Sequence, residues 1–110
     1  MFKQGEVINA VVKSVSIDNG DHGILSAWMS LDYGGAVQSF GGYALHCPEA
    51  KIPYDCAGKW IWRCLDICDK QQWEKIPGSA IRVRMGERAT IEAIGHLLND
   101  DWFCPSEDLK

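Results

Sequence analysis

The glycine-rich segment LDYGGAVQSFGGY, residues 31–43, holds the side chains of this sequence that are best suited to contact a ligand. Glycine lets a ligand approach the backbone closely, and aromatic rings offer flat faces for stacking. Asp32 and Gln38 add hydrogen-bonding groups. We therefore expect one wall of a binding site to consist of Tyr33, Gly34, Gly35, Gln38, Phe40 and Gly41. The alternative is a tight hairpin whose aromatic rings belong to the core.

Two arginines on one predicted strand provide positive charge for such a site. Arg82 and Arg84 alternate with apolar residues, so they project from the same face of the strand. Paired guanidinium groups suit a phosphate or a carboxylate, because each can bind it through two hydrogen bonds. Trp102 would complete the wall. The alternative is that the arginines pair with four acidic residues near the C-terminus, Asp100, Asp101, Glu107 and Asp108.

A histidine base is the starting point of the enzymatic alternative. His22 or His96 could act as acid or base beside Asp32 in a hydrolase or a cyclase-type reaction. A nucleophile, however, needs a base and an orienting group within reach. The neighbours His46 and Cys47 do not indicate such a dyad, because adjacent side chains of an extended segment point in different directions. We therefore expect no catalytic residues, and a small His/Asp-dependent hydrolase remains the alternative.

The five cysteines form neither a disulfide framework nor a metal-binding pattern. Their odd number and scattered positions indicate reduced thiols. A structural zinc site normally contains close Cys-x-x-Cys pairs, and the sequence has none. Cys64 and Cys68 fall on an apolar stripe, where a thiol behaves as a small hydrophobe. Because the paired glycines also lack the spacing of phosphate-binding loops, we expect neither a metal nor a cofactor.

Length and charge limit the class of protein. A chain of 110 residues is expected to form one domain. Its net charge of -4 argues against broad nucleic-acid binding, which needs a basic surface. The sequence has no run of 18 apolar residues and no apolar core of a signal peptide near its start, so we expect a cytoplasmic protein without membrane contact.

Period-two alternation predicts strands at residues 6–17, 24–31, 37–45, 80–85 and 90–98. The first of them carries apolar residues on both faces, which predicts that it is covered on both sides near its start. Asn19-Gly20 predicts a type I′ turn between the first two strands. A helix is expected at residues 56–70, capped by Asp55. Its apolar stripe consists of Trp60, Ile61, Cys64, Leu65 and Cys68.

These elements predict the α+β class, with one domain over residues 1–110. An antiparallel sheet of about five strands in the order strand-strand-strand-helix-strand-strand would carry the helix across one face. Residues 99–110 form an acidic and aromatic tail that Trp102 and Phe103 would attach to the body. An exposed edge at the first or last strand would favour a homodimer.

Four motifs resemble a family of small proteins encoded by tailed bacteriophages and prophages. They are DHG, LDYGG, FGGY and DDWF, and the resemblance covers residues 12–107. The family is richer in glycine around Gln38, so Val37 and Ser39 are departures that would hinder a ligand needing a bare loop. The five cysteines do not belong to the pattern. The resemblance implies a phage accessory protein made in the cytoplasm of an infected bacterium.

Phage accessory proteins of this size are often counter-defence factors, so the resemblance implies a non-catalytic antagonist of a bacterial defence system. It could sequester a small phosphate-bearing nucleotide signal or occlude a host defence protein. In the second mode it would act as an anti-CRISPR-type inhibitor that binds a nuclease effector complex. The expected partner is thus a nucleotide-type ligand or a host defence protein.

Overall fold

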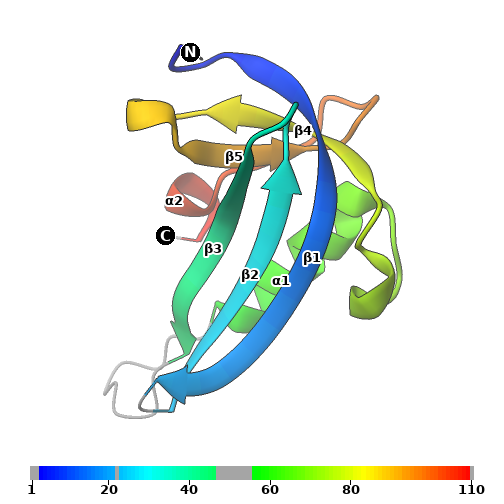
Figure 1. Ribbon diagram of the computed structural model, residues 1–110. Helices are drawn as coiled ribbons and strands as arrows, with labels where there is room; N and C mark the ends of the chain where they lie inside the picture. Colours follow the sequence, from blue (N-terminus) through cyan, green and yellow to red (C-terminus); the bar gives the residue numbers. More distant parts are fainter. Residues whose placement is uncertain (1–2, 22, 47–55, 110) are drawn as a thin grey trace.

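Six strands form one antiparallel sheet, and one long helix packs across one of its faces (Figure 1). The computed structural model describes residues 3–21, 23–46 and 56–109. The strands are β1 (Val7–Asp21), β2 (Ile24–Asp32), β3 (Val37–His46), β4 (Ala80–Met85), β5 (Ile91–Gly95) and β6 (Trp102–Phe103). Their order in the sheet is β3-β2-β1-β4-β5-β6. The predicted α+β class and antiparallel sheet are confirmed, with one strand more than expected.

β1 is a central strand that joins the two halves of the sheet. Residues 7–11 pair with β4, and the strand pairs with β2 from Val11 onward. The β2 register shifts between Val12 and Ser14, where the Val12 N–H donates to Ser79 O and Val12 O accepts from the Gly78 N–H. Figure 1 shows β1 bending along its whole length. The first strand is therefore not an edge, and the two edges of the sheet are β3 and β6.

The turn between β1 and β2 lies later in the chain than predicted. β1 continues through Asn19 and Gly20 to Asp21, which pairs with Ile24. The Gly20 N–H donates to Asp18 Oδ1 at 3.3 Å, within a stretch where the register shifts. Gly20 does not have the positive φ of a type I′ turn. The predicted Asn19-Gly20 turn is wrong, because this dipeptide forms a bulge inside the strand.

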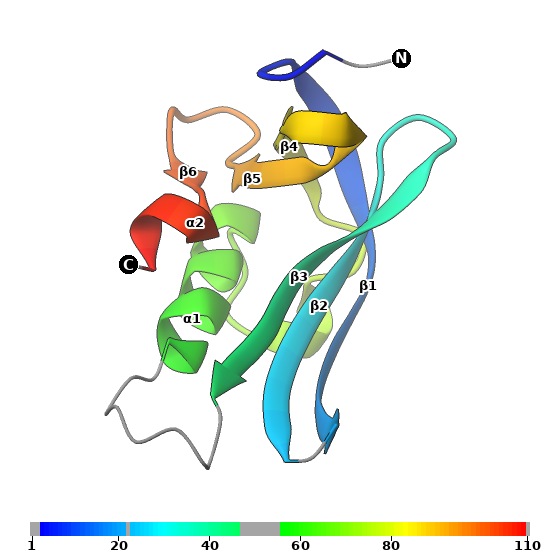
Figure 2. The same ribbon diagram turned by 90° about the vertical axis from the view of Figure 1, so that its left-hand side faces the viewer.

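The helix α1 (Ala57–Cys68) lies on one side of the sheet (Figure 2). Its buried residues are Ala57, Trp60, Cys64, Ile67 and Cys68, close to the predicted stripe. The helix ends at Asp69, whose φ of 57° is left-handed, and the Lys70 N–H donates to Leu65 O at 3.0 Å. The predicted cap Asp55 lies outside the described residues. No helix in the described part of the chain is long and apolar enough to cross a membrane.

The face of the sheet under α1 is called the inner face here, and the opposite one the outer face. Along β2, Ala27, Met29 and Leu31 point to the inner face and are fully buried. Trp28 alternates with them and points to the outer face, as does Asp32. On β4 the inner residues are Ile81, Val83 and Met85, and the outer residues are Ala80, Arg82 and Arg84. The core of the protein therefore lies between the inner face and α1.

The C-terminal tail is part of the sheet and not an appendage. β5 ends at Gly95, so the predicted strand over residues 90–98 is too long. Residues 96–101 form a loop that the His96 N–H closes with a 3.0 Å hydrogen bond to Asp101 O. β6 then pairs with β5, and the helix α2 (Pro105–Asp108) follows. Phe103 on the inner face is fully buried.

Candidate functional site

The predicted ligand wall is divided between the two faces of the sheet. Phe40 lies on the inner face and is only 3% exposed. It stacks on Trp60 with ring centroids 5.8 Å apart, and it meets Phe103 edge-on at 6.2 Å. The prediction that Phe40 stacks on a ligand is wrong, because the helix side chains enclose its ring.

The paired glycines of β3 make room for the protein's own tryptophans. A Cβ at Gly41 would lie 1.9 Å from Cζ3 of Trp28, the residue paired with Gly41 on β2. A Cβ at Gly42 would lie 2.9 Å from both Trp60 and Leu45 on the inner face. The side chains that approach this backbone therefore belong to the chain itself. The Trp28 ring thus occupies the outer-face position that a side chain at residue 41 would take, while Gly41 itself remains exposed at the edge of the sheet.

Tyr33 and Gln38 form a pair beside the core. The Tyr33 hydroxyl donates to Gln38 Oε1 at 3.1 Å, and both residues are half-buried. Tyr33 packs against the core cluster, and Gln38 is paired with the inner residue Leu31. The two side chains therefore do not share a face with the arginines of β4.

The turn between β2 and β3 is built around Gly34 and Gly35. Their φ angles of 94° and 90° are the positive values that the two central residues of a type I′ turn require. Asp32 Oδ1 accepts the N–H groups of both glycines at 3.2 Å, and the Tyr33 N–H donates to Ala36 O at 3.0 Å. One carboxylate oxygen of Asp32 is thus committed to fixing the turn.

Three of the predicted site residues, Trp102, Arg82 and Arg84, meet on the outer face. Gly95 is paired with Arg82 on one side and Trp102 on the other. Because a Cβ at Gly95 would lie 2.6 Å from the Trp102 ring, only glycine allows the ring to lie flat across β5. The guanidinium carbons of Arg82 and Arg84 lie 5.0 and 5.6 Å from the ring centroid. This arrangement is a cation–π cluster of one ring and two cations.

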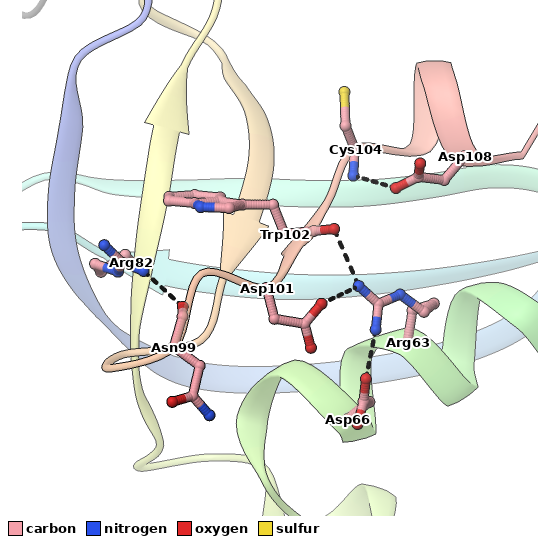
Figure 3. A network of polar contacts seen from close by, with 8 residues as sticks. All are labelled: Arg63, Asp66, Arg82, Asn99, Asp101, Trp102, Cys104 and Asp108. Carbon is pink, nitrogen blue, oxygen red and sulfur yellow. Dashed lines mark hydrogen bonds and ion pairs between the residues drawn. The ribbon is translucent and has the colours of Figure 1, made fainter.

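The hydrogen bonds of the arginines go to loop carbonyls and to one acid of β5. Arg82 Nε donates to His96 O at 2.9 Å, and its Nη2 donates to Asn99 O at 2.8 Å (Figure 3). Arg84 Nε donates to Glu92 Oε1 at 2.9 Å. Burial alone would lower the pKa of Arg84, but the hydrogen bond and charge of Glu92 outweigh it and raise this pKa. Both side chains are therefore held in place before any ligand arrives.

One acid of the tail, Asp101, forms its ion pair with a cation of α1 and not with Arg82 or Arg84. Arg63 of α1 forms ion pairs with Asp66 and, at 2.9 Å, with Asp101, and its Nη2 also donates to Trp102 O at 3.0 Å (Figure 3). Asp108 Oδ2 accepts the Cys104 N–H at 2.9 Å. The alternative that Arg82 and Arg84 pair with the acids of the tail is wrong for Asp101, because its cation comes from the helix.

The histidines of the enzymatic alternative do not assemble a catalytic set in the described residues. His96 follows β5, and its Nδ1 accepts the N–H groups of Leu98 and Asn99 at 3.1 Å. Asp32 and His96 line different hollows. His22 lies outside the described residues. His96 and Asp32 thus each serve as the hydrogen-bonding centre of a turn.

A hollow of about 540 Å³ opens on the outer face between the β2–β3 turn and the loop after β5. It is lined by Asn9, Ala10, Val11, Asp32, Gly34, Gly35, Ala80 and Leu97. Val11 is paired with Asp32 on one side and with Ala80 on the other, so these three form a continuous row. Asn9 is paired with Arg82, which connects the hollow to the Trp102 cluster.

Asp32, Gly34 and Gly35 are the predicted residues that reach this hollow, and sequence reasoning missed the others. Val7 and Val11 are each 45% exposed on the outer face. The prediction that the start of the first strand is covered on both sides is therefore wrong for the described chain. The apolar residues on both faces of this strand are the sequence signal for the hollow, although the same pattern is typical of a strand inside the core.

The described cysteines are sealed in the core. Cys56, Cys64, Cys68 and Cys104 are free thiols and buried. Burial, helped by the neighbouring Cys68, raises the pKa of Cys64 far above its ordinary value, and burial raises the pKa of Cys68 to about 12. Within residues 3–21, 23–46 and 56–109, no group of His, Cys, Asp and Glu side chains could hold a metal ion.

Comparison with protein families, with curated proteins and with solved structures finds no match to this chain.

Proposed function

We propose that this protein is a non-catalytic inhibitor that binds another protein through the outer face of its sheet. The observation that carries the proposal is the hollow beside Asp32, lined by the exposed Val11 of β1. A strand with apolar residues on both faces normally has both faces covered, and here the described part of the chain covers only the inner one. A partner protein supplies the missing cover.

The lining of the hollow suits a basic side chain. Val11, Ala80 and Leu97 offer an apolar surface, and Asp32 offers a carboxylate held in a fixed position. Lysine and arginine carry a long aliphatic stem with a cation at its tip. The stem fits the apolar wall, and the cation pairs with Asp32. A carboxylate disfavours a phosphate group at the same position, so this hollow supports protein contact over capture of a nucleotide.

The cluster next to the hollow has the composition of an interface anchor. Tryptophan and arginine are the residues most often found at the energetic centre of protein interfaces. Trp102 and Arg82 form such a pair on the outer face, and Arg82 is paired with Asn9 of the hollow. Because the arginine is already held by two loop carbonyls, it loses little freedom when a partner binds.

The class of the partner protein is proposed from the resemblance to phage proteins. This resemblance supports a host defence protein as the partner, and the net charge of -4 favours one with a basic, nucleic-acid-binding surface. The proposed action is occlusion of that surface, as in an anti-CRISPR-type inhibitor.

A photo-crosslinking residue at Val11 tests the proposal in host cells. We expect one crosslinked host protein, attached next to a lysine or arginine. Asp32→Asn should abolish crosslinking, because it removes the charge and keeps the oxygen that fixes the turn. Asp18→Asn is the matched control, since Asp18 also accepts a nearby backbone N–H, that of Gly20, and is exposed elsewhere. The proposal is contradicted if both substitutions leave the crosslinking yield unchanged, or if the crosslink attaches to a partner residue far from any lysine or arginine.

Calorimetry separates the nucleotide alternative from the protein one. We expect no heat of binding with cyclic nucleotides or cyclic ADP-ribose isomers. Binding that disappears in Arg82→Gln would instead assign the outer face to a phosphate-bearing ligand.

A further inference from the structure

We propose that the protein forms a symmetric homodimer through the free edge of β3. This strand is one edge of the sheet and is ten residues long. Figure 2 views the molecule from the β3 side, and no other ribbon crosses in front of the strand. Residues 37–42 contain no charged residue and no proline, the two devices that most often protect an edge from pairing.

The hydrogen-bonding pattern identifies the groups that are available for pairing. The Tyr33 N–H donates to Ala36 O, and bonded and non-bonded pairs alternate from there along an antiparallel ladder. The backbone groups of Val37, Ser39 and Gly41 therefore point away from β2. None of these three residues takes part in the backbone hydrogen bonds that the described chain makes outside its helices and strands. Three N–H and three C=O groups thus form a template for another strand.

The edge is complementary to itself. In an antiparallel pair centred on Ser39, Val37 lies opposite Gly41 of the second copy. The Trp28 ring covers Gly41 on the outer face, and Val37 is 52% exposed on that same face. The valine would therefore pack on the tryptophan of the second copy, twice by symmetry. Cross-strand pairs of an aromatic and a β-branched residue stabilise antiparallel sheets.

Charge explains why a second copy pairs at this edge. Two chains of net charge -4 repel each other unless their contact is free of charge, which residues 37–42 provide. The other edge, β6, has two residues and is followed by Pro105. Pairing about Ser39 places the twofold axis perpendicular to the sheet. Both outer faces of the dimer therefore point in the same direction. The dimer would present its two hollows side by side.

Sedimentation equilibrium of the full chain tests the dimer. We expect a mass of twice 12.3 kDa for the unmodified protein and of one chain for Ser39→Lys, because the substitution puts two like charges opposite each other on the axis. Ser14→Lys is the matched control: Ser14 lies in the same cross-sheet row, through Ser30, on the central strand. It adds the same charge to the same face and should leave the dimer intact.

Hydrogen exchange supplies a residue-level readout. The amides of Val37, Ser39 and Gly41 should be protected in the unmodified protein and exchange freely in Ser39→Lys. A monomer at every concentration, or a dimer that Ser39→Lys leaves intact, overturns the proposal. Loss of the dimer in Ser14→Lys as well also overturns it, because the charge would then act without contacting the edge.

Discussion

On the inner face the ring of Trp60 lies over Gly42, and on the outer face the ring of Trp102 lies over Gly95. Both contacts use a strand glycine to bring a large ring against the backbone. The surroundings differ, since Trp60 is enclosed by other aromatic rings and Trp102 carries arginines. A tryptophan over a glycine thus stabilises the core on one face and supports a charged surface on the other.

The glycine pair of β3 follows the same rule as Gly95. A missing Cβ in a strand provides space, and a ligand or an internal ring can fill it. In β3 both spaces are filled from within, by Trp28 at Gly41 and by Trp60 at Gly42. The rings of the chain itself therefore take the side-chain space at the glycine pair, whereas the hollow near the β2–β3 turn stays open.

Removing the inner ring should have the largest effect. Trp60 is fully buried and contacts Phe40 and Phe103. We expect Trp60→Ala to lower the free energy of unfolding by about 3–5 kcal/mol in urea denaturation, because a large cavity remains. Trp62→Ala is the control on the same helix, where the side chain is 61% exposed, and should change stability by no more than about 0.5 kcal/mol. Equal losses in the two variants would contradict the sealed core.

Displacing the outer ring should have an intermediate effect. In Gly95→Ala the new Cβ would overlap the Trp102 ring, so the ring must leave β5 and its two arginines. We expect a loss of about 1–3 kcal/mol and a shifted indole N–H resonance for Trp102. The control is Gly58→Ala, where the new Cβ has no other atom within 4 Å, so this substitution should not lower the free energy of unfolding. An unshifted Trp102 resonance in Gly95→Ala would mean that the ring does not depend on this glycine.

Local patterns predicted the positions of several elements well. β4 has the predicted bounds, because strict alternation is flanked by glycine on both sides. The helix stripe of Trp60, Cys64 and Cys68 is buried as expected, because its spacing places these residues on one helical face. Such patterns depend on residues close together in the sequence, so no knowledge of the rest of the fold was needed.

The face that each aromatic ring occupies could not be predicted from the sequence. Alternation shows that Phe40 and Gly41 lie on opposite faces, but not which face a helix covers. The position of Trp28 over Gly41 depends on the register between β2 and β3, which is set by the turn at Gly34. The predicted strand over residues 90–98 includes His96, but β5 ends at Gly95 and His96 Nδ1 accepts N–H groups of the loop that follows.

The buried thiols of the inner face should make the stability of the protein depend on pH. The pKa of Cys68 is raised to about 12 from an ordinary 9.0, and that of Cys64 is raised as well, so both stay protonated in the fold when the unfolded chain has lost the protons. Stability should be constant below pH 9 and fall above it, by up to about 1.4 kcal/mol per pH unit and thiol. Urea denaturation from pH 8 to pH 10.5 in reductant measures the slope, and Cys68→Ala should reduce it. A slope unchanged in that variant would assign the alkaline loss to other groups.

The ion pair beside the outer ring should contribute least. Arg84 and Glu92 are joined by a 2.9 Å contact, and their side chains are 30% and 36% exposed, so water screens their attraction. We expect Glu92→Gln to cost roughly 0.2–1 kcal/mol and the loss to shrink as salt is added. Because Arg84 also lies over Trp102, its own substitution removes two contacts at once, and a double-mutant cycle with Glu92→Gln isolates the pair. A coupling energy above this range would contradict the expectation that water screens the attraction between Arg84 and Glu92.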